Sequence, residues 1–369
     1  QQLQQPAVQQ EARLCGVAQH VQPGVLRRQR NAGEVDVGGD VLQPHLGQRV
    51  AIGLVALVAH QGAHVALRMV VLTLREPVVQ KEGGAALAAT LQALAEKPGH
   101  WTPFAGGTDL MVFLESGSLP PQNFLSLLHL PELRGITITP QTITLGALTT
   151  HREIRENPLL QQEFPNLCQA ARETGAISIQ NRGTLGGNLA NASPAADSPP
   201  ALLSYDAELE LISQRGSRRI PYRDFHFGYK KTQRAPDELI IKIILNRISI
   251  SNSRIFRHFY RKVGTRKAQS IAKIGLAGFT KVREGRCEDI RISFASVAPI
   301  PIRCLQMEAK IRGEKWNPLL VREIPKFLAQ EIKPIADIRS TSEYRLHIAQ
   351  RLLLEMLRQA YHVELDRQS

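Results

Sequence analysis

The chain has 369 residues, of which 43% are hydrophobic and 21% are charged, and its formal net charge is +13 at pH 7. This composition is that of a globular protein with room for two or three domains, and no apolar run approaches the ~18 residues of a membrane span. The four cysteines, at positions 15, 168, 287 and 304, show no C-x-x-C spacing, which argues against a zinc or iron–sulfur site and for a reducing, cytoplasmic compartment.

The N-terminal part of the chain differs from the rest in composition. Residues 1–80 contain 13 Gln and no Lys, Phe, Tyr or Trp, whereas all 19 aromatic residues come later. Without large aromatic side chains, a segment of this size has little around which to build a core. No signal-peptide order of regions is visible either. We therefore predict that residues 1–76 are an atypical segment that is disordered or non-native.

From residue 77 onward the hydrophobic pattern is that of a folded α+β protein. In a first domain, over 77–246, the predicted elements are a helix at 85–95, strands at 101–105 and 124–128, a hairpin at 136–148, helices at 151–157 and 164–174, and strands at 207–213 and 239–245. A Ser-rich connection at 246–254 ends this domain. A smaller α+β domain, over 254–362, is predicted to hold apolar or alternating segments at 268–282 and 289–297 and helices at 319–330 and 343–361.

Two segments rich in small residues are the most informative features. The first is Thr-Pro-Phe-Ala-Gly-Gly-Thr-Asp-Leu at 102–110, and the second is Gly-Thr-Leu-Gly-Gly-Asn-Leu-Ala-Asn-Ala-Ser-Pro-Ala-Ala-Asp at 183–197. Glycine lets a backbone come close to a ligand, and successive amides in a turn form a concave anion site. Neither segment has the G-x-G-x-x-G or P-loop spacing. Together they predict one phosphate-bearing ligand that is held from two sides.

This pair of segments resembles the FAD-binding subunit or domain of the molybdenum hydroxylases, the xanthine dehydrogenase and carbon monoxide dehydrogenase group. The resemblance covers residues 77–362 and includes Phe-His-Phe-Gly-Tyr-Lys-Lys-Thr at 225–232, Pro-Asp-Glu-Leu at 236–239 and Tyr-Arg-Lys-Val-Gly-Thr-Arg at 260–266. It implies a two-lobed FAD-binding domain of the PCMH type, followed by a C-terminal domain of the carbon monoxide dehydrogenase flavoprotein type.

The resemblance also implies the residues that bind FAD. Those of the first segment would present amides and a hydroxyl to the diphosphate, and those of the second would complete the diphosphate, ribityl and ribose contacts. Ile240 and Lys262 would touch the flavin, where a lysine stabilises the reduced anion. The implied residues are Pro103, Phe104, Ala105, Gly106, Gly107, Thr108, Asp109, Leu110, Thr184, Gly187, Asn188, Asp197, Ile240 and Lys262.

Several of these assignments have alternatives. Asp109 suits the cap of the next helix as well as it suits a ligand contact. Arg261 replaces Lys262 if the register slips by one residue. Thr174 stands where relatives place an aromatic residue against the adenine, and Ile271 packs either over the flavin or in the core. We interpret His151, His226 and His258 as structural or surface residues, because their spacing is not that of metal ligands.

The implied function is electron transfer, with no catalytic and no metal-binding residue in this chain. A molybdopterin-binding large subunit would oxidise a purine or related heterocycle. Electrons would then pass through 2Fe-2S clusters on a partner chain to FAD, and as hydride to NAD+. The motifs favour a bacterial xanthine dehydrogenase, and subunits for carbon monoxide, aldehydes or aromatic acyl-CoA remain open.

A basic stretch leads to an alternative from another class. Residues 215–273 carry 16 Lys or Arg against three acids. We interpret such a stretch either as a solvated surface or as a surface that contacts an acidic partner subunit or the phosphates of a dinucleotide. Nucleic acid fits least, since no aromatic stacking platform accompanies the charges. The alternative is therefore a non-catalytic nucleotide- or nucleic-acid-binding protein, whereas the main interpretation includes neither nucleic acid nor membrane among the partners.

Overall fold

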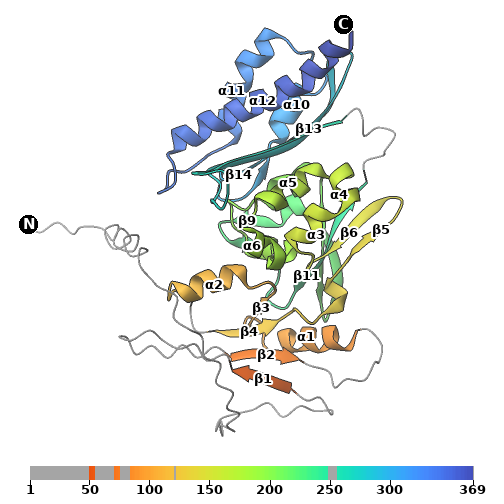
Figure 1. The fold of residues 1–369 in the computed structure, drawn as a ribbon, viewed down its shortest axis with the longest axis vertical. Helices are drawn as coiled ribbons and strands as arrows, with labels where there is room; N and C mark the ends of the chain where they lie inside the picture. Colours follow the sequence, from red (N-terminus) through yellow and green to blue (C-terminus); the bar gives the residue numbers. More distant parts are fainter. Residues whose placement is uncertain (1–49, 55–69, 75–83, 120–121, 248–255, 369) are drawn as a thin grey trace, which may run out of the picture. The chain divides into compact units, whose positions relative to one another are not determined.

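A computed structural model describes residues 50–54, 70–74, 84–119, 122–247 and 256–368. Its described elements form the predicted α+β architecture (Figure 1), with two lobes in the first domain and a separate C-terminal sheet that is covered by helices. The expected boundary at 246–254 lies mostly outside the described residues.

The first lobe is a four-stranded sheet in the order β1-β2-β4-β3. Its elements are β1 (Val50–Leu54), β2 (Val70–Leu74), α1 (Ala85–Glu96), β3 (Trp101–Phe104), α2 (Thr108–Glu115) and β4 (Asn123–Ser126). Strands β3 and β4 are parallel, so the chain must cross over between them, and α2 lies in that crossover. This connection places the N-terminus of α2 at the carboxyl end of β3, where α/β units commonly bind anions.

Strands β1 and β2 lie inside the segment that was expected to be disordered. They pair with each other in an antiparallel ladder, and β2 continues in parallel with β4. The expectation that residues 1–76 as a whole are disordered or non-native stays a prediction, while these ten residues form strands in the structure. The physical reason is that Val-Ala-Ile-Gly-Leu and Val-Val-Leu-Thr-Leu are apolar runs of high strand propensity that extend an existing sheet without aromatic side chains. The remainder of residues 1–76 lies outside the described residues.

The second lobe is a five-stranded antiparallel sheet in the order β5-β6-β11-β7-β8. Its strands are β5 (Ile136–Ile138), β6 (Thr142–Gly146), β7 (Glu208–Ser213), β8 (Gly216–Pro221) and β11 (Leu239–Asn246), and a small ribbon is made by β9 (His226–Gly228) and β10 (Lys231–Thr232). Its helices are α3 (His151–Glu156), α4 (Pro158–Glu163), α5 (Pro165–Glu173), α6 (Ile177–Arg182), α7 (Leu185–Ala190) and α8 (Ser198–Ser204), with short 3-10 turns η3 (Pro131–Leu133) and η4 (Tyr222–Asp224). The central strand β11 is almost continuously buried, as its run of Leu and Ile predicts.

The C-terminal domain is a four-stranded antiparallel sheet that packs on both faces. Its elements are β12 (Phe256–Val263), β13 (Ile274–Arg283), β14 (Arg286–Ala295), β15 (Ile302–Arg303), α10 (Leu305–Ile311), α11 (Pro318–Glu331) and α12 (Ser342–Gln368). Helices α10 and α12 pack against this sheet, and so do α5 and α8 of the second lobe. Because strand residues alternate between faces, Leu276 of β13 joins the C-terminal core while Ala277 and Phe279 join the core of the first domain.

A buried carboxylate in α10 should anchor the C-terminal domain. Glu308 accepts hydrogen bonds from Arg303 Nε at 2.5 Å and from the amide of Ile292 at 2.8 Å. Glu308→Ala removes one partner of a buried ion pair, so we expect the free energy of unfolding to fall by about 3 kcal/mol, measured as a shift of the guanidinium midpoint. The control is Glu323→Ala, which removes an exposed carboxylate paired with Lys326 and should change stability little. Equal shifts for the two variants would contradict the anchoring role.

Candidate functional site

The two glycine-rich segments meet around one cavity of about 1130 Å³. The cavity also has walls from β11, from residues 269–272 and from the loop before α12. Of the 14 residues implied by the sequence, all but Lys262 line it, namely Pro103, Phe104, Ala105, Gly106, Gly107, Thr108, Asp109, Leu110, Thr184, Gly187, Asn188, Asp197 and Ile240. Thr174 and Ile271 line it too, and Thr174 donates a hydrogen bond to the carbonyl of Ala170 at 2.8 Å.

The first segment turns β3 into the N-terminus of α2. Gly107 is the N-cap residue and adopts a left-handed conformation with φ 73°, and no side chain caps the helix. The first-turn amides of α2, at residues 108–110, therefore have no partner within the helix while they border the cavity. Unpaired amides and the helix dipole together favour an anion at this point. Asp109 stands in the first turn and is not the cap.

The second segment folds differently from the open glycine loop that we expected. Residues 185–190 form the short helix α7, with Thr184 as its N-cap. The Gly187 amide donates to Thr184 Oγ1 at 3.2 Å, and the Gly186 amide donates to the carbonyl of Ala147 at 2.9 Å. Because these amides are already paired, the backbone amides that can bind an anion in the cavity are those of α2. The second segment presents side chains to the cavity instead.

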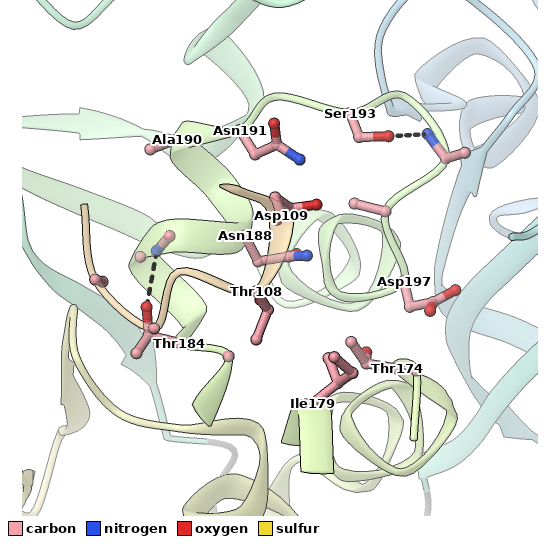
Figure 2. A pocket seen from close by; sticks show the side chains of 18 of the residues that line it. Thr108, Asp109, Thr174, Ile179, Thr184, Asn188, Ala190, Asn191, Ser193 and Asp197 are labelled. Carbon is pink, nitrogen blue, oxygen red and sulfur yellow. Dashed lines mark hydrogen bonds between the residues drawn. The ribbon is translucent and has the colours of Figure 1, made fainter. Parts of the chain in front are cut away.

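Those side chains include two acceptors that lack a partner. Asn188 Oδ1 and Asp197 Oδ1 are buried and make no hydrogen bond within the described part of the chain. Figure 2 shows Asn188, Asn191, Ser193 and Asp197 spread along the second segment, around the same space as Thr108 and Asp109. A buried polar atom without a partner costs free energy, so these oxygens indicate a ligand that carries hydrogen-bond donors.

The other carboxylate oxygen of Asp197 is held by Lys262 of β12. Lys262 Nζ lies 2.7 Å from Asp197 Oδ2 and 2.9 Å from the carbonyl of Glu173, and both charged side chains are buried. Burial raises the pKa of Asp197 to about 6, and the ammonium of Lys262 counteracts that shift only in part. Arg261, the alternative to Lys262, donates instead to Glu355 at 2.8 Å, and neither of the two basic residues is among those that line the cavity.

This raised pKa should make stability depend on pH. Between about pH 4 and pH 6 the folded chain holds a proton on Asp197 that the unfolded chain releases, with a reference pKa of 3.8. The contribution of this group to the free energy of unfolding therefore falls as the pH rises through that window, by about 3 kcal/mol in total. Asp197→Asn removes the titration, so the parent-minus-variant difference in unfolding free energy should fall between about pH 4 and pH 7. Parallel profiles for the two proteins would contradict this prediction.

Of the three histidines that we interpreted as structural or surface residues, two are buried and His258 is half-buried. His151 and His226 are buried, and His258 Nδ1 lies 3.1 Å from the hydroxyl of Tyr205. Burial lowers the pKa of each of the three to about 4, so each is neutral near pH 7. Across the described ranges, no cluster of three or more His, Cys, Asp or Glu could hold a metal ion.

From the C-terminal domain the sequence analysis named Ile271 and Lys262, and it missed Ser296 and Arg345, which line the cavity. Ser296, with φ 65°, donates its amide to the carbonyl of Pro194 at 2.9 Å and its hydroxyl to the carbonyl of Ala272 at 3.0 Å. Arg345 is buried and donates to the carbonyl of Ser296 at 3.1 Å and to Asp337 at 2.6 Å. Most of these contacts join residues that are far apart in the sequence, so no local sequence motif predicts them.

The basic stretch at 215–273 does not form one free face. Four acids from outside it neutralise part of its charge. The pairs that they make are Lys242 and Arg219 with Glu210, Arg247 with Glu163, Lys262 with Asp197, and Arg261 with Glu355. Within the stretch, Arg215 pairs with Asp237 and Arg218 with Glu238. About half of the basic residues of this stretch therefore pair with carboxylates, most of which are buried or half-buried.

Comparison with known proteins identifies the family. Residues 84–246 match the FAD binding domain in molybdopterin dehydrogenase, and residues 258–360 match the CO dehydrogenase flavoprotein C-terminal domain. The chain is 31% identical over 277 residues to the putative xanthine dehydrogenase FAD-binding subunit of Escherichia coli strain K12, a match that covers 75% of this chain and 94% of that protein. This chain belongs to the FAD-binding subunits of the molybdenum hydroxylase family.

Other members of the family are about equally similar. The chain is 30% identical over 257 residues to the glyceraldehyde dehydrogenase medium chain of Sulfolobus acidocaldarius, which covers 70% of this chain and 89% of that protein. Its fold matches that of carbon monoxide dehydrogenase from Hydrogenophaga pseudoflava with a TM-score of 0.71 at 24% identity, over 76% of this chain and 96% of the other. The resemblance and the fold class predicted from the sequence are thereby confirmed. Among the described residues, no helix is long and apolar enough to cross a membrane.

Proposed function

We propose that this FAD-binding subunit carries electrons within a molybdenum hydroxylase complex, and that the cavity between the glycine-rich segments is its FAD site. The observation that supports this proposal most strongly is that an uncapped helix N-terminus and two buried acceptors without a partner in the described residues border the same cavity. The anionic diphosphate of a dinucleotide can bind at the helix N-terminus, and its hydroxyl groups can donate hydrogen bonds to the two buried acceptors. The family match supports FAD as the dinucleotide.

The hydrogen-bonding and apolar groups of the cavity match the parts of FAD. The first-turn amides of α2 would receive the diphosphate, with Pro103 to Leu110 around it. Asn188 Oδ1 and Asp197 Oδ1 would accept from ribityl or ribose hydroxyls, and Ile240 would contact the flavin ring. Lys262 would act through Asp197, which it holds in place, or reach the flavin directly as the sequence predicts. When bound, FAD supplies the capacity to accept and release electrons one or two at a time.

The partners in this proposal follow from the family. Relatives carry names such as FAD-binding subunit and medium chain, which mark them as parts of larger assemblies. We propose a molybdopterin-binding large subunit and a 2Fe-2S subunit as the partners of this chain, with electrons that pass from the clusters to the cavity and then to NAD+. The cytoplasmic location and the NAD+ acceptor are still predictions.

The substrate of the complex is proposed as a purine. The support is the Escherichia coli relative, whose name specifies xanthine dehydrogenase. The glyceraldehyde dehydrogenase medium chain of Sulfolobus is 30% identical and the carbon monoxide dehydrogenase medium chain of Hydrogenophaga is 24% identical, so aldehydes and carbon monoxide are competing substrates, and aromatic acyl-CoA is a further one. Substrate oxidation by the assembled complex, assayed with xanthine, an aldehyde and carbon monoxide, separates these choices.

The flavin site is tested by a pair of asparagine variants. Asn188→Ala removes a cavity acceptor, and loss of one or two hydrogen bonds costs about 1 to 3 kcal/mol. The FAD dissociation constant should therefore rise roughly 5- to 150-fold, measured by flavin fluorescence titration of the purified chain. The control, Asn181→Ala, alters an exposed residue of α6 that does not line the cavity and should bind FAD like the parent.

Two results would count against the proposal. If Asn188→Ala and Asn181→Ala bind FAD equally, the cavity is not the site. If the parent chain binds no flavin but retains DNA with an affinity that falls steeply with salt, the chain is the nucleic-acid binder of the alternative interpretation.

A further inference from the structure

A second hollow, of about 610 Å³, lies between β12 and α12, away from the residues that line the main cavity. Helix α12 is the long helix near the C-terminus in Figure 1. The residues that line this groove are Arg257 and His258 of β12 and Arg351, Leu354, Glu355, Arg358 and Gln359 of α12. We refer to these seven residues as the arginine groove.

The arginine groove carries more positive than negative charge, with three arginines and one glutamate among its seven residues. Arg257, Arg351 and Arg358 make no ion pair within the part of the chain that the structure describes, although this chain pairs many of its other arginines. The one carboxylate of the groove, on Glu355, is engaged by Arg261 at 2.8 Å. Burial lowers the pKa of His258 to about 4, so the imidazole adds no charge at neutral pH. The groove therefore presents three guanidinium groups without acid partners.

The spacing of these arginines favours a protein segment over a single anion. Arg351 and Arg358 stand seven residues apart on α12, which is two helical turns and about 10.5 Å along the axis. Two carboxylates placed about two turns apart on a helix, or at a similar separation on an extended segment, match this spacing, so one protein segment can engage both arginines. Guanidinium groups bind carboxylates through two parallel hydrogen bonds. Leu354, between the two arginines in sequence, is half-buried and offers apolar contact.

We propose that the arginine groove docks an acidic segment of a partner subunit. The identity of that partner as a subunit of the same molybdenum hydroxylase complex rests on the proposed function. Charge complementarity supplies the recognition, because a segment with Asp or Glu spaced by about two helical turns would pair with Arg351 and Arg358 together. None of the seven residues of the groove lines the FAD cavity, so a change of charge in the groove should leave the flavin-binding residues in place.

The test compares two double variants of equal charge in the full chain. Arg351→Glu/Arg358→Glu reverses the charge of the groove. Arg283→Glu/Arg322→Glu makes the same change in net charge at two exposed positions of the C-terminal domain that lie outside the groove. Each chain is produced together with the molybdopterin-binding and 2Fe-2S subunits of the proposed complex. The fraction that co-purifies as a complex is measured, along with bound FAD.

We expect the groove variant to keep its FAD and to lose at least tenfold in complex formation, while the control variant assembles like the parent. Equal assembly of the two variants would overturn this inference alone. Failure of the parent chain to form any complex would overturn both this inference and the proposed function. If the groove variant assembles normally but loses binding to a single-stranded DNA probe that the control retains, the groove is a nucleic-acid site and the inference is wrong.

Discussion

The cavity depends on two stretches of backbone that approach each other more closely than side chains would permit. A Cβ on Gly106 would overlap the carbonyl oxygen of Arg182, and a Cβ on Gly186 would lie 2.6 Å from the Cβ of Ala147. Glycine at position 106 lets the β3–α2 turn of the first lobe contact the α6–α7 turn of the second, and glycine at position 186 lets α7 pack against Ala147 within the second lobe. These contacts bring the uncapped amides of α2 and the free oxygens of Asn188 and Asp197 to one space.

The C-terminal domain completes this site as well as carrying its own core. Lys262 of β12 fixes Asp197, and Ser296, which directly follows β14, donates its amide to the carbonyl of Pro194 in the second segment. A buried ion pair gains little net stability because both charges lose hydration, so its presence here fits a role in orientation. Strand β13 supplies residues to both hydrophobic cores, which ties the wall of the cavity to the stability of both domains.

The sequence predicted those parts of the structure that local patterns encode. Glycine clusters, alternating strands and the Ala/Leu-rich helix can each be recognised from about ten neighbouring residues, and the first segment took the predicted turn before a helix. Helix α7 could not be foreseen, because a Gly-Gly pair disfavours helix; the Thr184 cap, the packing on Ala147 and the burial of Leu185 and Leu189 stabilise it. The Lys262–Asp197 pair joins residues 65 positions apart, and Arg345 reaches Ser296 from 49 positions away, so neither contact leaves a local trace.

The most direct measurement is an experimental structure of the chain with FAD bound. We expect the diphosphate oxygens to lie about 2.7 to 3.2 Å from the first-turn amide nitrogens of α2. The Gly186 amide should still donate to the carbonyl of Ala147, and the Gly187 amide to Thr184 Oγ1. We also expect a hydroxyl of the ligand at Asp197 Oδ1. A diphosphate that lies on α7 with those bonds broken, or FAD bound outside the cavity, would contradict the account.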